Sequence, residues 1–348
     1  MKLLAEKQLE KLETHLDGVT SRLLSARGLA SLNEMLRVYV ARGGKRIRPQ
    51  LTVWTYQHAT STDELPSALL DVAAAWELFH AFLLIHDDII DGSDKRRAYP
   101  SLHRQLQSLD SNSPRFGVNL GIVAGDLMYA ATLRVLAELD VPAEAYRGLH
   151  RLFSSVSTLT GFGQAIDILQ SHADLQSVDE ETLLREYHWK TAAYTFEGPM
   201  LSAAILAGLS DAQQEAISQY ALSLGQAYQL QNDLIDLAQP ASEGCDLVEG
   251  KRTITLLRAR SILPAQERPS FDGRIAAIQS GDGNAVKLAE AFRRDLLATS
   301  AVEQTRDSIN GLLNASATAA ADQDLPPALG KAMEQLLGKL QQSYFAAA

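Results

Sequence analysis

Three aspartates in the segment HDDIID, Asp87, Asp88 and Asp91, are spaced so that they share one face of a helix. Residues three and four apart are neighbours on a helix surface, so the three carboxylates would repel one another. Gly92 predicts the end of this helix, and acids in a last turn also meet the negative pole of the helix dipole. A divalent cation would offset both costs. Mg²⁺ is the best candidate, because it combines one or two carboxylates with water and phosphate oxygens. A solvated acidic helix end is the alternative interpretation of a single box.

A second acidic box, QLQNDLID, begins on another stretch with helical periodicity. Asp233 and Asp236 again share a helix face, with Asn232 beside them, and Pro240 predicts the end of the helix. Facing helices of a bundle can bring two such boxes together across a cavity. Two or more Mg²⁺ ions held in this way would neutralise a diphosphate and make it a better leaving group.

Basic side chains recur beside glycines and acids. The segment GGKRIRP places Lys45, Arg46 and Arg48 in a glycine-containing turn, where charge and bidentate geometry suit a phosphate. Further cations stand at Arg96, Arg97, Lys190 and Lys251. A surface charge cluster is the alternative for each of them taken alone. The sequence has no Walker A loop, no HExxH zinc motif and no GxSxG serine motif.

Composition narrows the class of protein. The chain has 348 residues and a formal net charge of −10, which makes nucleic acid an improbable partner. Its one cysteine, Cys245, excludes an intrachain disulfide and fits a reducing cytoplasm. The first 18 residues are amphipathic and charged, and no stretch reaches about 18 uninterrupted apolar residues. We therefore expect a cytoplasmic protein with no signal peptide and no membrane span.

Helical periodicity runs through the whole chain. Pro66 opens a helix that should run to Asp91, a length of roughly 39 Å at 1.5 Å per residue. Other long helices are expected over 117–139, 145–170, 179–208 and 210–238. Neither an alternating strand pattern nor an internal repeat is evident. The sequence thus predicts one all-α domain over 1–348, a bundle of long helices around a deep central cavity.

The motifs taken together resemble those of the trans-isoprenyl diphosphate synthases, the polyprenyl synthetase family. The matching segments are GGKRIRP, HDDIID with the following RR, GQAID, KTA, QLQNDLID and DLVEGKRT, in family order over about residues 28–260. Residues 261–348 carry further helices with less diagnostic sequence. The resemblance implies the isoprenoid synthase fold and Mg²⁺-dependent, head-to-tail condensation of isopentenyl diphosphate with an allylic prenyl diphosphate. It also implies a homodimer and two or three Mg²⁺ ions, for which Mn²⁺ could substitute.

The resemblance also assigns roles by motif. The implied metal ligands are Asp87, Asp88, Asp91, Asp233 and Asp236. The residues implied to bind isopentenyl diphosphate are Lys45, Arg48, His80 and Arg97. Those implied at the allylic substrate are Arg96, Gln164 and Asp167. Those implied to stabilise the departing diphosphate and the allylic cation are Lys190, Thr191 and Gln229. Lys251 is implied to close over the diphosphate.

Three departures from the family pattern are visible. Asn232 replaces the first aspartate of the second box, so this position can offer an amide oxygen but no charge. The loop between Asp236 and Asp246 is short and lacks the lysine that many members carry before the second of these acids. Ala98 and Ser101 replace the usual glycine and threonine after the paired arginines. The first two departures concern metal affinity and the capping of the diphosphate.

Two aromatic residues precede the first box and could limit the length of the product. Phe82 lies about 7.5 Å along the helix axis from Asp87, and Phe79 lies nearly one turn further. A bulky residue at this depth closes the pocket in the family, which predicts a short product, farnesyl or geranylgeranyl diphosphate. Ordinary core packing is the alternative role for both rings.

Two other functions compete with a synthase. A class I terpene cyclase shares an acidic box and an all-α fold, but Asp236 stands where such a cyclase needs a hydroxyl ligand, and GGKRIRP would have no role. A non-catalytic regulatory subunit of a hetero-oligomeric synthase usually lacks the first acidic box, which is intact here.

Overall fold

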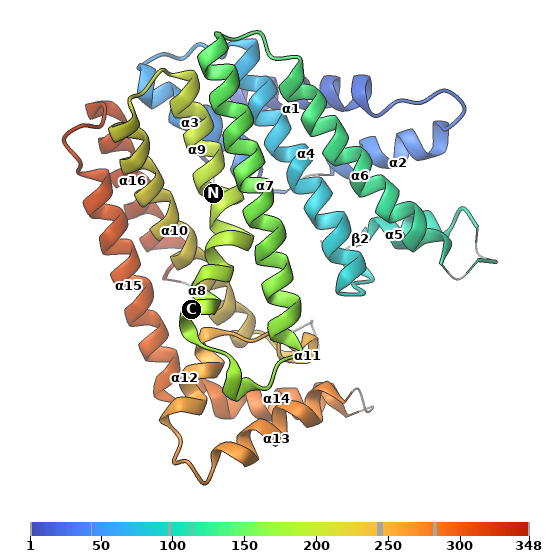
Figure 1. Ribbon diagram of the computed structural model, residues 1–348, viewed down its shortest axis with the longest axis vertical. Coiled ribbons are helices and arrows are strands. Elements are labelled where there is room, and N and C mark those ends of the chain that lie inside the picture. The colour runs from blue at the N-terminus through green and yellow to red at the C-terminus, as the bar shows by residue number, and fades with distance from the viewer. Residues whose placement is uncertain are drawn as a thin grey trace. The chain divides into compact units, whose positions relative to one another are not determined.

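The chain is helical almost throughout in its computed structural model (Figure 1), as the sequence predicts. The structure describes residues 2–42, 44–96, 99–110, 112–113, 115–241, 246–280 and 284–346. Contacts between residues divide the chain into a first unit, Met1–Leu152 with Pro199–Leu209, and a second unit, Phe153–Gly198 with Ser210–Ala348. Neither unit is one continuous stretch, and the single domain expected from the sequence stays a prediction.

Helix α4 (Ser67–Ile90) is the packing centre of the first unit. It contacts α1 (Glu6–Leu23), α2 (Ala30–Ala41), α3 (Ile47–Thr60) and α6 (Phe116–Ala137), and α6 lies beside it in Figure 1. The remaining elements of this unit are β1 (Lys95–Arg96), β2 (Tyr99–Pro100), α5 (Leu102–Gln107), the start of α7 (Ala143–Ser171) and most of α9 (Gly198–Leu206).

The ends of α4 follow from its sequence. Pro66 occupies the N-cap position in an extended conformation. At the other end Gly92 has a φ of +65°, a conformation that only glycine adopts without strain, and Ser93 N–H donates to the carbonyl of Asp88. These boundaries were predicted, and they fix the first acidic box in the last turn of a helix that is buried along most of its length.

Two helices, α4 and α6, are long and apolar enough to cross a membrane by length and composition. Their apolar windows are 67% and 44% buried inside the protein, respectively. The core helix of a globular unit meets the same criteria of length and composition. The packing of α4 against the other helices of its unit therefore explains its apolar character. The absence of a membrane span stays a prediction.

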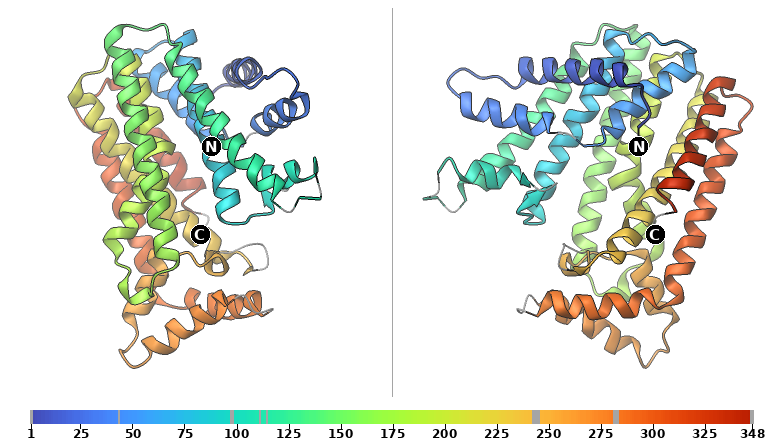
Figure 2. Two further views of the ribbon diagram at one scale, coloured as in Figure 1. Left: turned by 45° about the vertical axis from the view of Figure 1, so that its right-hand side comes forward. Right: turned by 180° about the vertical axis from the view of Figure 1, so that it is seen from behind.

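Helix α10 (Asp211–Ala238) is the packing centre of the second unit. A capping box at Ser210 and Gln213 begins it, and it ends before Pro240 as predicted. The long helix α15 (Ser300–Ala320) lies along it (Figure 2). The other elements of this unit are the rest of α7, η1 (Leu175–Ser177), α8 (Glu180–Glu186), η2 (Tyr187–Glu197), α11 (Asp246–Glu249), α12 (Ile254–Ile262), α13 (Arg268–Gln279), α14 (Ala285–Leu297) and α16 (Pro327–Ser343).

The helix predicted over 179–208 is in fact three segments, because α8 and α9 are separated by a π-helix, η2. Two glycines let neighbouring helices approach it closely. A Cβ on Gly163 of α7 would lie 2.4 Å from the backbone nitrogen of Lys190, and one on Gly225 of α10 would lie 2.4 Å from the Cβ of Ala192. Such π segments are frequent at functional sites. The short β1–β2 hairpin was also not predicted.

Candidate active site

The first acidic box is bound by an arginine from the β1–β2 hairpin. Arg96 Nε donates to Asp88 Oδ1 at 2.6 Å, and an Nη2 hydrogen of Arg96 points to Asp87 Oδ2 at 3.2 Å. The Asp88 side chain is almost fully buried, whereas Asp87 is partly exposed. The structure thus brings three of the predicted site residues together, and the hairpin is the element that places the arginine.

Asp88 is held in an unfavourable environment for an anion. Burial raises its pKa, an effect that Arg96 opposes and Asp87 reinforces. Its second oxygen, Oδ2, is buried and has no hydrogen-bond partner within the described part of the chain. A buried carboxylate oxygen left over in this way fits a cation ligand.

A cavity of about 300 Å³ opens beside this box within the first unit. Among the residues predicted to bind substrate, His80 and Arg96 line it, together with the unpredicted Tyr39 and Tyr99. The other lining residues are Val40, Arg42, Arg46, Glu77, Ala81, Leu84, Pro100 and Gln105. Of the remaining predicted residues, Lys45 is exposed on the turn and Arg48 is buried in α3. The prediction for Arg97 lies outside the described residues.

Arg46 of the GGKRIRP segment forms several contacts with buried or partly buried groups of the first unit. It is 5% exposed and forms ion pairs with Glu77 at 2.6 Å and Glu13 at 2.9 Å. Its Nη2 also donates to the carbonyl of Val40 at 2.8 Å. Burial lowers its pKa, but the two glutamates raise it more strongly. The structure therefore favours a scaffolding role for Arg46 over the phosphate contact suggested by its motif.

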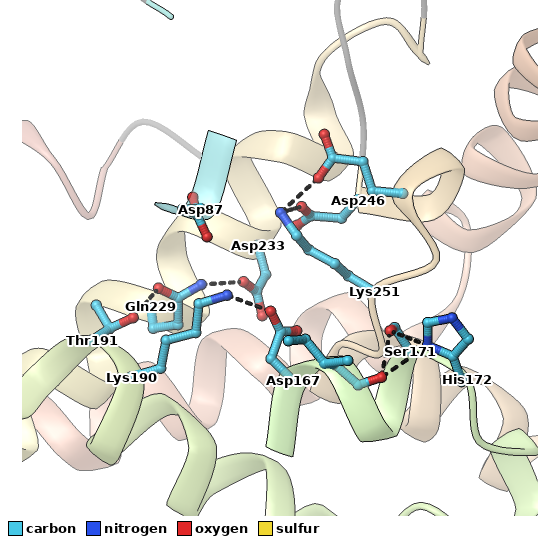
Figure 3. Close-up of polar contacts among 12 residues, drawn as sticks. Asp87, Asp167, Ser171, His172, Lys190, Thr191, Gln229, Asp233, Asp246 and Lys251 are labelled. Atoms are coloured by element: carbon cyan, nitrogen blue, oxygen red, sulfur yellow. Dashed lines mark hydrogen bonds and ion pairs between the residues drawn. The ribbon is translucent and has the colours of Figure 1, made fainter. Parts of the chain in front are cut away.

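The second box forms a connected set of polar side chains in the second unit (Figure 3). Gln229 Nε2 donates to Asp233 Oδ1 at 2.9 Å, and Thr191 Oγ1 donates to Gln229 Oε1 at 3.2 Å. Beside them Lys190 forms an ion pair with Asp167. The sequence placed these five residues in one site, and in the structure they form two neighbouring groups, Thr191–Gln229–Asp233 and Lys190–Asp167 (Figure 3). Gln164 Nε2 is buried without a partner within the described residues.

The loop after the second box contacts it through Asp246. The Asp246 N–H donates to Asp236 Oδ2 at 3.1 Å, and the Asp246 carboxylate pairs with Lys251 at 3.1 Å. Lys251 also pairs with Glu249 at 2.7 Å. The lysine predicted to close over the diphosphate is therefore held near the box by neighbouring acids, although part of the intervening loop, 242–245, lies outside the described residues.

Negative charge is in excess around the second box. The carboxylates that influence one another are Asp167, Glu186, Asp233, Asp236, Asp246 and Glu249, and the nearby cations are Lys190 and Lys251. Burial, followed by repulsion from Asp246, raises the pKa of Asp233 to about 8 and that of Asp236 to about 6. Burial also raises the pKa of Glu186 well above its usual range. A divalent cation would relieve this repulsion.

Both boxes therefore fit Mg²⁺ by the chemistry of their donors. Within the described residues no group of three or more His, Cys, Asp or Glu side chains is placed to enclose a metal alone. Mg²⁺ does not require such an enclosure, because it keeps water and substrate phosphate oxygens in its shell. The leftover oxygen of Asp88 and the crowded acids around Asp233 are the observations that support this assignment.

Tyr187 is a site residue that the sequence did not reveal. Its hydroxyl donates to Asp233 Oδ2 and accepts from the backbone N–H of Ile254 at 3.3 Å, and the side chain is 3% exposed. Burial and the nearby Asp233 raise its pKa, so it stays a neutral donor. An aromatic residue on an apolar helix face usually indicates core packing, and no sequence signal marks its hydroxyl as part of a site.

Three aromatic rings form a cluster, two of them on α4 before the first box and the third on α6. The ring centroids of Phe79 and Phe82 are 5.7 Å apart, and Tyr129 of α6 lies 5.1 Å from Phe82 and 6.1 Å from Phe79. Phe79 is 1% exposed, whereas Phe82 and Tyr129 are partly exposed. Phe79 is therefore the buried member of the cluster. Tyr129 was not predicted, because it lies about 40 residues from the first box in the sequence.

An all-helical chain with an acidic box at the end of each of two long helices, and a lysine–threonine pair on a third segment, has the arrangement of the isoprenoid synthase class. The sequence profile of the polyprenyl synthetase family matches residues 30–289. The chain belongs to this family.

Known relatives agree with this placement. The chain is 33% identical over 239 residues to a geranylfarnesyl diphosphate synthase of Natronomonas pharaonis, across 63% of this chain and 65% of the relative, slightly less than two thirds of its length. It is 28% identical to a geranylgeranyl diphosphate synthase of Methanosarcina mazei, across 72% and 74% of the two chains. A crystal structure of geranylgeranyl pyrophosphate synthase from Corynebacterium glutamicum, complexed with isoprenyl diphosphate and magnesium, has a TM-score of 0.81 and 29% identity, covering 94% and 98%.

Proposed function

We propose that the protein is a Mg²⁺-dependent trans-prenyltransferase. It would condense isopentenyl diphosphate head-to-tail with an allylic diphosphate such as dimethylallyl, geranyl or farnesyl diphosphate. The observation that carries this proposal is the connected set around Asp233, in which Thr191 and Gln229 lie beside the Lys190–Asp167 pair. A terpene cyclase binds no second diphosphate, so Lys45 and Arg48 of GGKRIRP would have no substrate to bind, and a regulatory subunit would not need both acidic boxes.

The residues have complementary roles in the proposed reaction. Asp87, Asp88 and Asp91 in the first box, and Asp233 and Asp236 in the second, would hold Mg²⁺, which neutralises the leaving diphosphate when bound. Arg96 would take part in binding the allylic diphosphate and Lys251 would cover it. Lys190 would offset the charge of the departing diphosphate. The side-chain oxygens of Thr191 and Gln229 would face the allylic cation.

The second substrate and the proton need no dedicated side-chain base. Lys45, Arg48, His80 and Arg97 are proposed to bind isopentenyl diphosphate, and His80 is the one of these that lines the described cavity. The alkene attacks the cation, and the proton is lost to the released diphosphate. Catalysis then rests on positioning and on preorganised charge. The apolar and aromatic wall excludes water, which would otherwise capture the cation.

We propose a short product of 15 to 20 carbons, with Phe82 and Phe79 as the residues that stop chain growth. Support comes from the cluster that Phe82 forms with Tyr129, a ring pair 5.1 Å apart and partly exposed. The relative named for a geranylgeranyl product, which has 20 carbons, is consistent with this range, whereas the geranylfarnesyl product of the other named relative is one five-carbon unit longer.

The protein is also proposed to work as a cytoplasmic homodimer. The outer face of α6 exposes Ile122, Val123, Leu127 and Leu133 at 42%, 49%, 39% and 48%, respectively. Four large apolar side chains along one helix face are typical of a surface that a partner covers. A second copy of the chain is the partner that the family resemblance implies.

Incubation of the purified chain with Mg²⁺, isopentenyl diphosphate and each allylic primer tests the proposed reaction. We expect prenyl diphosphates of 15 to 20 carbons, no product after chelation of the metal, and at least about 100-fold slower turnover in Asp88→Asn. Hydrocarbons formed without isopentenyl diphosphate would identify a cyclase. Activity that appears only after addition of another synthase subunit would identify a regulatory subunit.

A further inference from the structure

The segment that follows α16 contacts the second acidic box at Asn232, the position where the family pattern has an aspartate. The Tyr344 hydroxyl donates to Oδ1 of Asn232. The Tyr344 ring stacks on Tyr228 with centroids 4.9 Å apart and an angle of 15°, and Gln231 Nε2 donates to the Tyr344 carbonyl at 3.1 Å. Three residues within two turns of α10 thus bind one tyrosine from a segment more than 100 residues later in the sequence.

The chemistry of this contact accounts for an asparagine at position 232. The Tyr344 hydroxyl is a neutral donor, because burial, followed by the influence of Tyr228, raises its pKa. Asn232 provides the acceptor oxygen without adding a carboxylate beside Asp233 and Asp236, where negative charge is already in excess. An acid at 232 would increase that repulsion, whereas the amide satisfies the tyrosine and adds no charge.

We propose that Tyr344 is a positioning residue of the second box. The amide oxygen of Asn232 accepts the hydrogen bond of the Tyr344 hydroxyl, and Asp233 and Asp236 bind the metal. The contact fixes the turn of α10 that carries both aspartates. Mg²⁺ demands nearly ideal octahedral geometry, so a looser turn would bind it less well. The metal part of this inference rests on the proposed function.

The variant Tyr344→Phe tests the proposal, because it keeps the stacked ring and removes only the hydroxyl. The readout is calorimetric binding of inorganic diphosphate at increasing Mg²⁺ concentration, which requires no turnover. We expect the Mg²⁺ concentration for half-maximal binding to rise about tenfold, since partners that orient metal ligands have effects of this size.

Tyr220→Phe is the matched control. The Tyr220 hydroxyl donates to the carbonyl of Met333 at 3.0 Å, so this variant also removes a buried tyrosine hydrogen bond between α10 and the C-terminal part of the chain. It lies three turns from the acidic box. Both variants should lower the melting temperature by a few degrees, about 2–4 °C. Only Tyr344→Phe should shift the Mg²⁺ dependence, and equal shifts in both variants would overturn the proposal.

A double-mutant cycle identifies the partner of the hydroxyl. Asn232→Ala should shift the Mg²⁺ dependence as Tyr344→Phe does, and the double variant should shift it no further, because both changes break one contact. Additive shifts would contradict the proposal, since they would mean that Asn232 acts on the metal independently of Tyr344.

A separate measurement distinguishes failure of the proposed function from failure of this inference. If the unmodified protein shows no Mg²⁺-dependent binding of diphosphate, the proposed function is wrong. Amide hydrogen exchange over residues 233–238 without metal then decides the positioning role. Faster exchange in Tyr344→Phe than in Tyr220→Phe supports it, and equal exchange overturns it.

Discussion

Asp88 and Asp233, the two buried aspartates of the site, are stabilised by different kinds of partner. Asp88 has a cation, Arg96, at hydrogen-bonding distance, whereas Asp233 receives two neutral donors, Tyr187 and Gln229. Neutral donors offset burial less well, which is one reason why the pKa of Asp233 rises to about 8. Near neutral pH a cation that binds Asp233 must therefore displace a proton.

The sequence identified the residues of the site, but it did not reveal all the side chains that form hydrogen bonds with them. Spacing identified the aspartates, and the family motifs identified Gln229 and Thr191, because both signals are local. The contacts of Tyr187 and Tyr344 depend on elements that are 46 and 112 residues away in sequence. A single sequence carries no periodicity or motif that reports such distant hydrogen bonds.

Phe82→Ala should lengthen the product by one or more five-carbon units, because it removes the partly exposed ring of the aromatic cluster. Tyr129→Ala should act in the same direction, since its ring completes the cluster from α6. Chromatographic sizing of the products provides the measurement. Phe292→Ala, a buried ring of α14, is the control for general loss of packing. Identical product distributions in all variants would remove the chain-length role.

Among the elements, the π-helix η2 is the feature that periodicity could not predict. The long α-helices α4 and α10 were predicted within one residue of their ends, because proline, glycine and capping residues mark those ends. A π segment of 11 residues differs from an α-helix only in how its backbone bonds are paired. Glycines of α7 and α10, which lie in other parts of the chain, allow these two helices to approach it closely.

Gly163→Ala tests whether this approach positions Lys190. The new methyl group would lie 2.4 Å from the Lys190 backbone nitrogen, so the π-helix must shift. We expect a loss of about 1–3 kcal/mol in the free energy of unfolding, as for an overpacked core. We also expect a roughly tenfold lower kcat, because displaced positioning residues have large kinetic effects.

Gly161→Ala is the matched control on the same helix. A Cβ there meets no atom within 4 Å, so alanine should raise the free energy of unfolding by about 0.5–1 kcal/mol and leave kcat unchanged. Chemical denaturation and steady-state assays measure both effects. Equal stability and activity in the two variants would show that the close approach has no role.

At the scale of the whole molecule, the sequence predicted an all-α chain correctly, because composition and helical periodicity hold from end to end. The division into two units was not visible, since the chain crosses between them inside helix α7, after the first residue of α9, and after Leu209. Boundaries inside continuous helical stretches leave no linker, and a linker is the signal on which domain predictions depend.

Leu127→Asp on the outer face of α6 tests the proposed dimer. A charge at the centre of a covered apolar face is costly, so we expect the mass in solution to fall from that of a dimer to that of a monomer. Light scattering after size-exclusion chromatography measures it. Leu288→Asp on α14, where the side chain is 42% exposed, is the control and should leave the mass unchanged. A monomeric unmodified protein, or a dimeric Leu127→Asp variant, would contradict the proposal.

The aromatic cluster of Phe79, Phe82 and Tyr129 has an evolutionary consequence. Its rings lie at least one turn along α4 from the acids, or on α6, so substitutions there leave the ionising groups in place. Under the proposed function, selection can change the length of the product one residue at a time without rebuilding the chemistry. Relatives named for geranylgeranyl and geranylfarnesyl products, which differ in length by one five-carbon unit, are the outcome that such a separation favours.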